Sequence, residues 1–169
     1  MSRATASTPT GATAQAQGDD LLKLQNQVCF ALAVASRSVI ALYRPVLEPL
    51  GLTHPQYLVM LALWEESPRT VGAIGRALQL EPATLSPLLK RLEAAGLIDR
   101  VRDPNDERML RVGLTETGRR LREQALGIPP QIVEKLGMEL AELEELRAVL
   151  HRVIAAATGE PGADQRASG

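Results

Sequence analysis

The sequence predicts a mainly α-helical fold with one small β-hairpin, and three observations predict it. Apolar residues recur at intervals of three and four in long stretches at both ends of the chain, which is the period of an amphipathic helix. Two shorter helical stretches between them are joined by a turn of about three residues. Two short strand-like runs, 97–102 and 109–114, flank a turn rich in Asp, Pro and Asn.

The two terminal helical stretches predict association between chains. The first covers residues 21–50, about seven turns, and a second apolar row beside its main stripe widens the face beyond what one small domain covers. The last carries a zipper-like stripe of leucine and valine flanked by glutamates. We therefore expect a homodimer whose dimerisation helices are about 19–50 and 129–158.

The central part of the chain, about 53–115, predicts a helix-turn-helix followed by a hairpin wing. Thr53 and Pro55 begin an apolar helix that stops near Ser67. Thr70 caps a short helix over 71–78, and a second helix runs from Glu81–Pro82 to residue 95. This spacing and order are typical of a winged helix-turn-helix, in which the second short helix reads DNA.

The ends of the chain and its composition set the domain count and compartment. Residues 1–18 and 159–169 contain mostly small and polar residues, so we expect disordered tails around one domain, 19–158. There is no signal-peptide pattern, and we expect no membrane span because charges recur within the helical stretches. With a single cysteine, the chain is expected to be cytoplasmic.

The charge distribution favours a nucleic-acid partner for the central third alone. The net charge is −1, but residues 69–111 contain eight basic and six acidic side chains. Dimerisation would place two such positive regions side by side, which favours binding to a double-stranded DNA operator.

Candidate DNA-binding residues lie on the second short helix and on the wing. Small polar side chains near the start of that helix would meet base edges, whereas later basic side chains would meet phosphates. The candidates on the helix are Thr84, Ser86, Pro87, Lys90 and Arg91. On the first wing strand, Arg100 and Arg102 are candidates for backbone contacts.

Cys29 has two interpretations. A free cysteine often packs as a small buried hydrophobe, whereas a reactive one is an oxidation sensor. A single thiol cannot form an intramolecular disulfide, so its oxidation must end as an oxyacid, a mixed disulfide or a bridge between chains. We expect no metal site and no cofactor, because His54, His151 and Cys29 lack partners at ligand spacing. No catalytic motif predicts an enzyme.

Three motifs together identify a resemblance to the MarR family of dimeric winged-helix transcriptional regulators, over about 21–157. They are LSPLLKRLEAAGLI at 85–98, DER at 106–108 and LTETG at 114–118. The resemblance implies that Arg108 enters the minor groove, with Asp106 beside it to hold the guanidinium.

Further motifs are similar to the one-cysteine organic hydroperoxide resistance regulators (OhrR) within that family. They are NQVCF at 26–30, YRPVL at 43–47, LTHPQYL at 52–58 and LWE at 63–65. The match places Cys29 at the peroxide-reactive position. Two tyrosine positions beside that thiol hold Ala33 and His54 here, and the third holds Tyr43.

The two remaining polar rings have different relations to the thiol. Tyr43 lies 14 residues beyond Cys29, about 21 Å along a helix, so the two would meet only across a dimer. His54 would supply a hydrogen-bond donor, or a positive charge when protonated, or would be an exposed residue at the helix cap.

The resemblance implies a repressor that releases its operator when an organic hydroperoxide oxidises Cys29 and a low-molecular-weight thiol caps it. The alternative is a MarR-type repressor released by a small aromatic or phenolic ligand, with Cys29 structural.

Overall fold

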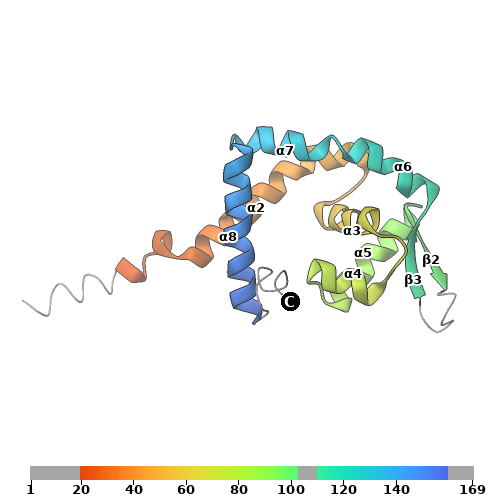
Figure 1. Cartoon of the computed structure of the whole chain (residues 1–169), viewed down its shortest axis with the longest axis horizontal. Helices are drawn as coiled ribbons and strands as arrows, with labels where there is room; N and C mark the ends of the chain where they lie inside the picture. The colour runs from red at the N-terminus through yellow and green to blue at the C-terminus, as the bar shows by residue number, and fades with distance from the viewer. Residues whose placement is uncertain (1–19, 103–109, 160–169) are drawn as a thin grey trace, which may run out of the picture. The chain divides into compact units, whose positions relative to one another are not determined.

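The structure, a computed structural model, describes residues 20–102 and 110–159, and its chain divides into two compact units, Met1–Leu42 and Tyr43–Gly169. Each unit is described by itself. The mainly α fold with a small sheet that the sequence predicts is confirmed. In chain order the elements are η1 (Leu24–Asn26), α2 (Val28–Leu47), η2 (Glu48–Leu50), α3 (His54–Glu65), β1 (Arg69–Thr70), α4 (Val71–Leu78), α5 (Pro82–Ala94), β2 (Ile98–Arg102), β3 (Leu110–Leu114), α6 (Glu116–Ala125), α7 (Ile128–Leu136) and α8 (Leu140–Thr158) (Figure 1).

The first unit does not contain the continuous helix from residue 21 that the apolar stripe predicts. Gln27 has an extended backbone, with φ −87° and ψ 116°, between η1 and α2. The Asn26 side-chain amide donates to the Asp20 carbonyl at 2.8 Å, and the Gln27 side-chain amide donates to the Leu21 carbonyl. These local bonds compete with helical hydrogen bonding, so the regular helix begins only at Val28.

The helix α2 is more apolar than we expected. Its only charged residues are Arg37 and Arg44. The stretch Val28–Leu50 has a mean hydropathy of 1.4 in an 18-residue window and is 11% buried there, so by length and composition it is able to cross a membrane. Our expectation that charges exclude such a segment is corrected, although one helix of this kind is weak evidence for a span.

The second unit has its core around α3. This helix is buried on most sides and contacts α4, α5, α6 and β3 (Figure 1). It was expected to be central, and its buried residues are Gln56, Tyr57, Val59, Met60, Ala62 and Leu63. At its start, the Thr53 backbone N–H donates to Gln56 Oε1 at 2.8 Å, which confirms Thr53 as the cap.

The turn between α4 and α5 is tight, which confirms the helix-turn-helix spacing. Gln79 takes the left-handed conformation with φ 53°, and the Leu80 N–H donates to the Gly75 carbonyl at 2.9 Å. A Cβ on Gly75 would lie 3.0 Å from the Leu80 carbonyl oxygen. The small residue at position 75 therefore lets the chain turn closely against α4.

The sheet has three strands where the sequence predicted a two-stranded hairpin. The strand order is β1-β3-β2, all antiparallel, with Arg69 opposite Val112 and Ile98 opposite Leu114. The strand β1 has only two residues, too few to show an alternating pattern. Thr70 also caps α4, since its Oγ1 accepts the Ala73 N–H at 3.1 Å.

A cluster of hydrogen bonds ties the start of α6 to the end of α5. We call it the Gly118 clamp, comprising Trp64, Gly96, Leu97, Thr115 and Gly118. Thr115 Oγ1 donates to the Gly96 carbonyl at 2.7 Å and accepts the Gly118 N–H at 3.0 Å. The Thr115 N–H donates to the Leu97 carbonyl at 3.1 Å, and Trp64 Nε1 donates to the Gly118 carbonyl at 2.9 Å. Elements distant in sequence are joined at this one point.

The C-terminal helical stretch is broken, and our expectation of one helix over 129–158 is wrong. Gly137 takes a left-handed conformation with φ 63° after α7 ends. A new cap follows, in which the Glu139 N–H donates to Glu142 Oε2 at 2.8 Å before α8 begins. No residue of α8 is buried, and its exposed large apolar side chains are Leu140, Leu146, Val149, Val153 and Ile154.

Replacing Gly118 with Ala should lower the free energy of unfolding by about 2 kcal/mol or more, because a Cβ there would lie 2.0 Å from the Leu97 carbonyl oxygen. Urea denaturation at one fixed protein concentration measures this. Gly127→Ala is the matched control, since its Cβ would meet its nearest atoms at an ordinary 3.7 Å and φ is −78°. A Gly118→Ala protein as stable as the Gly127→Ala protein would contradict the close approach.

Candidate functional site

The helix α5 presents one packed face and one polar face. Its leucines at 85, 88, 89 and 92 are buried in the core. The predicted DNA-binding residues of this helix are all exposed: Thr84, Ser86, Pro87, Lys90 and Arg91. Packing of the leucine face leaves the other side of α5 free to approach a duplex.

The wing strand β2 carries the two predicted arginines on exposed positions. Arg100 Nε lies 3.2 Å from Glu93 Oε2, so this side chain is paired with α5. Arg102, at the end of β2, is exposed. Asp106 and Arg108 lie outside the described residues, and their assignment stays a prediction.

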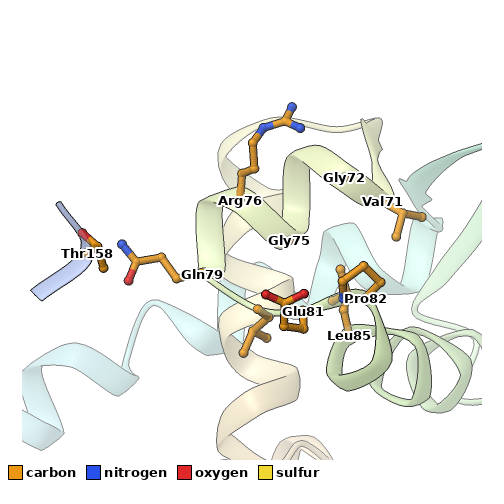
Figure 2. Close-up of a pocket in the computed structure, with 10 residues that line it drawn as sticks. Val71, Gly72, Gly75, Arg76, Gln79, Glu81, Pro82, Leu85 and Thr158 are labelled. Carbon is orange, nitrogen blue, oxygen red and sulfur yellow. The ribbon is translucent and has the colours of Figure 1, made fainter. Parts of the chain in front are cut away.

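A hollow of about 630 Å³ lies along the helix-turn-helix (Figure 2). Its walls come from α4, from the turn, from the start of α5 and from Thr158. Figure 2 shows the Arg76 side chain extending away from the other lining side chains. Arg76 adds a basic group in the last turn of α4 that the sequence analysis did not single out.

Cys29 is the second residue of α2 and is exposed within the first unit. This thiol is therefore not a core residue of the first unit. The two side chains expected to support this thiol, Tyr43 and His54, belong to the second unit.

Four rings form a group along α3. His54, Tyr57 and Trp64 belong to α3, and Tyr43 belongs to α2. Tyr43 and His54 meet edge to face, with ring centroids 4.9 Å apart and planes at 65°. Tyr57 lies 6.0 Å from Tyr43 and 6.3 Å from Trp64, again measured between ring centroids. The sequence analysis missed Tyr57 and Trp64 as members of this group, although Tyr57 lies three residues after His54 and Trp64 lies seven residues after Tyr57, spacings that set them on one helical face.

Burial sets the charge of these rings. Burial lowers the pKa of His54 below its ordinary value of 6.5 and raises the pKa of Tyr43 above 10.0. The pKa of Tyr57 is raised by burial and then by the charge of Tyr43. His54 is half-buried rather than an exposed cap residue, and it and Tyr43 are neutral at pH 7. The group therefore offers hydrogen-bond donors, not a cation.

A smaller apolar hollow of about 250 Å³ lies between α3 and the α6–α7 segment. Leu61 and Leu126, both exposed, form part of its wall together with two of the rings. One cation and one anion also border it, so a small molecule with an aromatic ring and a charged group matches its lining. The full set is Tyr57, Leu61, Trp64, Glu65, Arg122, Ala125, Leu126 and Pro129.

No metal site is visible in residues 20–102 and 110–159. In those ranges no three or more His, Cys, Asp or Glu side chains gather closely enough to hold an ion.

The tight turn, the polar face of α5 and the paired strands define a winged helix-turn-helix protein. The chain belongs to the MarR family of transcriptional regulators. The MarR family model matches residues 52–110. The chain is 42% identical over 135 residues to the organic hydroperoxide resistance transcriptional regulator of Bacillus subtilis, covering 80% of this chain and 92% of that protein.

Solved structures agree with this membership. Reduced AbfR bound to DNA matches with a TM-score of 0.71 and 36% identity, over 84% of this chain and 97% of that one. AbfR is a protein of Staphylococcus epidermidis. PcaV, a transcriptional regulator of Streptomyces coelicolor in complex with its natural ligand, matches with a TM-score of 0.71 and 25% identity, over 80% of this chain and 97% of that one.

The imidazole of His54 should titrate below 6.5, because burial against Tyr43 disfavours its charged form. The unfolded chain then binds more protons than the folded one below pH 6.5. The free energy of unfolding should rise with pH from the folded-state pKa of His54 up to about 6.5, and this gain should be lost as the pH falls. NMR titration of the two histidines, assigned with His151→Gln, measures the pKa.

Tyr43→Ala uncovers the His54 ring and should bring its pKa back toward 6.5. A His54 pKa at or above 6.5 in the unmodified protein would mean that the ring is a cation source after all.

Proposed function

We propose that this protein is a transcriptional repressor that binds a double-stranded DNA operator and releases it when an organic hydroperoxide oxidises Cys29. The carrying observation is that the chain's single cysteine is exposed near the start of α2, in a chain 42% identical to an organic hydroperoxide resistance regulator. The protein acts as a cytoplasmic DNA-binding regulator rather than as an enzyme.

DNA binding rests on the exposed polar face of α5. Ser86 and Thr84 lie near the helix start, where side chains reach base edges, and Lys90 and Arg91 lie one turn later, where they reach phosphates. Arg102 extends the basic surface along β2. For Arg108, which lies outside the described residues, the sequence resemblance supports entry into the minor groove. AbfR, which is 36% identical, is bound to DNA in its reduced form.

The DNA-binding form is a homodimer built from the terminal helices. Large apolar side chains are exposed on α2, among them Phe30, Val34 and Ile40, and on α8. Apolar faces of this extent are covered by a partner in a stable soluble protein. Light scattering at micromolar concentration should return about twice the chain mass of 18.2 kDa, and a monomer there would contradict the dimer.

The sensing reaction uses the thiolate of Cys29. Its sulfur attacks the terminal oxygen of the hydroperoxide, an S–O bond forms and the O–O bond breaks. The alkoxide takes a proton and leaves as an alcohol, so sulfur is oxidised to the sulfenic acid and the peroxide is reduced. A low-molecular-weight thiol then displaces the hydroxyl as water and leaves a mixed disulfide, because the chain has no second cysteine.

Tyr43 and His54 support this reaction from the partner chain. Their rings contact each other at 4.9 Å and both are neutral at pH 7, so they donate hydrogen bonds to the thiolate instead of supplying a positive charge. Such bonds favour the thiolate over the thiol. His54 thereby takes over the donor role at a position where tyrosine would otherwise stand.

A second candidate function is release by a small aromatic or phenolic ligand, with Cys29 structural. The hollow between α3 and the α6–α7 segment favours it, since Tyr57, Trp64 and Arg122 border a space of about 250 Å³. PcaV, at 25% identity, is in complex with its natural ligand.

Cys29→Ser should keep the operator affinity of the reduced protein and lose the response to hydroperoxide, because the hydroxyl does not form a sulfenic acid. The probe is a duplex selected by the reduced protein from a random DNA library. It is titrated with and without an organic hydroperoxide plus a small thiol, at two salt concentrations. Affinity should fall steeply with salt if phosphates are contacted by Lys90 and Arg91. Ser38→Ala, an exposed hydroxyl on the same helix, is the matched control and should respond normally.

Mass spectrometry of the treated wild type should show one thiol adduct, on Cys29. If Cys29→Ser still leaves the duplex after peroxide, or if fully oxidised wild type stays bound, the sensing role is wrong. Release of both proteins by an aromatic carboxylate such as benzoate would then support the second candidate.

A further inference from the structure

The only tryptophan of the chain joins two parts of the second unit that the proposed function leaves unconnected. Trp64 is the next-to-last residue of α3 and is half-buried. Its indole Nε1–H donates to the Gly118 carbonyl in the first turn of α6 at 2.9 Å. At the other end of α3, which is about 18 Å long, His54 contacts Tyr43.

The path between these ends is continuous. Tyr57 lies within 6.0 Å of Tyr43 and 6.3 Å of Trp64, measured between ring centroids. Tyr43 belongs to α2, but His54, Tyr57 and Trp64 all belong to α3, and this helix is buried on most of its surface, so it moves as a rigid body more readily than it bends. A displacement at Tyr43 or His54 therefore reaches Trp64.

Beyond Trp64 the Gly118 clamp leads directly to the DNA-binding elements. Thr115 Oγ1 accepts from the Gly118 N–H and donates to the Gly96 carbonyl, and Gly96 follows the end of α5. The wing is held at the same place, since the Leu114 N–H of β3 donates to Ser67 Oγ at 3.0 Å. Trp64 of α3 is thus hydrogen-bonded to Gly118, next to the junction of α5, the wing and α6.

We propose that Trp64 is the positioning residue that couples the sensor to the DNA-binding surface. In this proposal, which rests on the proposed function, oxidation in the dimer displaces Tyr43 and His54, and α3 carries the displacement to the Trp64–Gly118 hydrogen bond. The clamp then shifts α5 and β3 together. The bond is specific to the indole N–H, so it is separable from the packing of the ring.

Trp64→Phe tests the coupling because it keeps an aromatic ring and removes the donor. Operator affinity is measured for reduced and oxidised protein, with the selected duplex described above. Reduced Trp64→Phe should bind within about threefold of wild type, since the other bonds of the clamp remain. The ratio of reduced to oxidised affinity should shrink by about threefold or more, the size expected for one lost hydrogen bond.

Gln131→Ala is the matched control. Gln131 Nε2 also donates to a glycine carbonyl, that of Gly127, at 2.9 Å, but it belongs to α7 and is not part of the Gly118 clamp. Its affinity ratio should equal that of wild type. An unchanged ratio in Trp64→Phe, with wild type still releasing DNA on oxidation, overturns the coupling role and leaves the proposed function standing. Wild type that stays bound when oxidised overturns the proposed function itself.

Fluorescence of the wild type provides a measurement that needs no variant. Because Trp64 is the single tryptophan, all tryptophan emission comes from the coupling residue. Oxidation of Cys29 should change its emission maximum or intensity, and the same treatment of Cys29→Ser should not. Identical emission from reduced and fully oxidised wild type would also overturn the coupling role.

Discussion

The junction of α5, the wing strand β3 and α6 depends on the close approach of Gly118 to the carbonyl of Leu97. A side chain at position 118 would stand 2.0 Å from that oxygen, so only glycine lets α6 begin there. The hydroxyl of Thr115 then accepts the Gly118 N–H in the first turn of α6 and donates to the Gly96 carbonyl beyond α5. The residues that follow α5, the end of β3 and the start of α6 are thus held together at this contact.

The region around α3 and the terminal helices differ in whether their apolar side chains are buried within one chain. The leucines of α5 and most of α3 are buried within the second unit, so this unit has its own core. The large side chains of α8 and many of α2 are exposed. The hydrophobic effect therefore forms the core around α3 and α5 within one chain but leaves the apolar side chains of α2 and α8 to be covered by another chain.

The rings along α3 show how burial determines the charge of polar aromatic side chains. A histidine at position 54 would bring a cation if it were exposed, but its contact with Tyr43 at 4.9 Å desolvates it and lowers its pKa. The same burial keeps Tyr43 protonated. These rings thus present neutral hydrogen-bond donors, and under the proposed function a thiolate favoured by them needs no fixed positive charge.

The sequence by itself determined the helix-turn-helix, the wing strands β2 and β3, the cap at Thr53 and the exposed candidates on α5, because periodicity and turn residues act locally. Only the tertiary structure decided where the terminal helices break, since the bonds of Gln27 and the left-handed Gly137 override a continuous apolar stripe. It also decided that two residues form β1, that His54 is neutral, and that Trp64 bonds to Gly118. Each of these depends on atoms distant in sequence or on competing local bonds, and the spacing of residue types does not report such contacts.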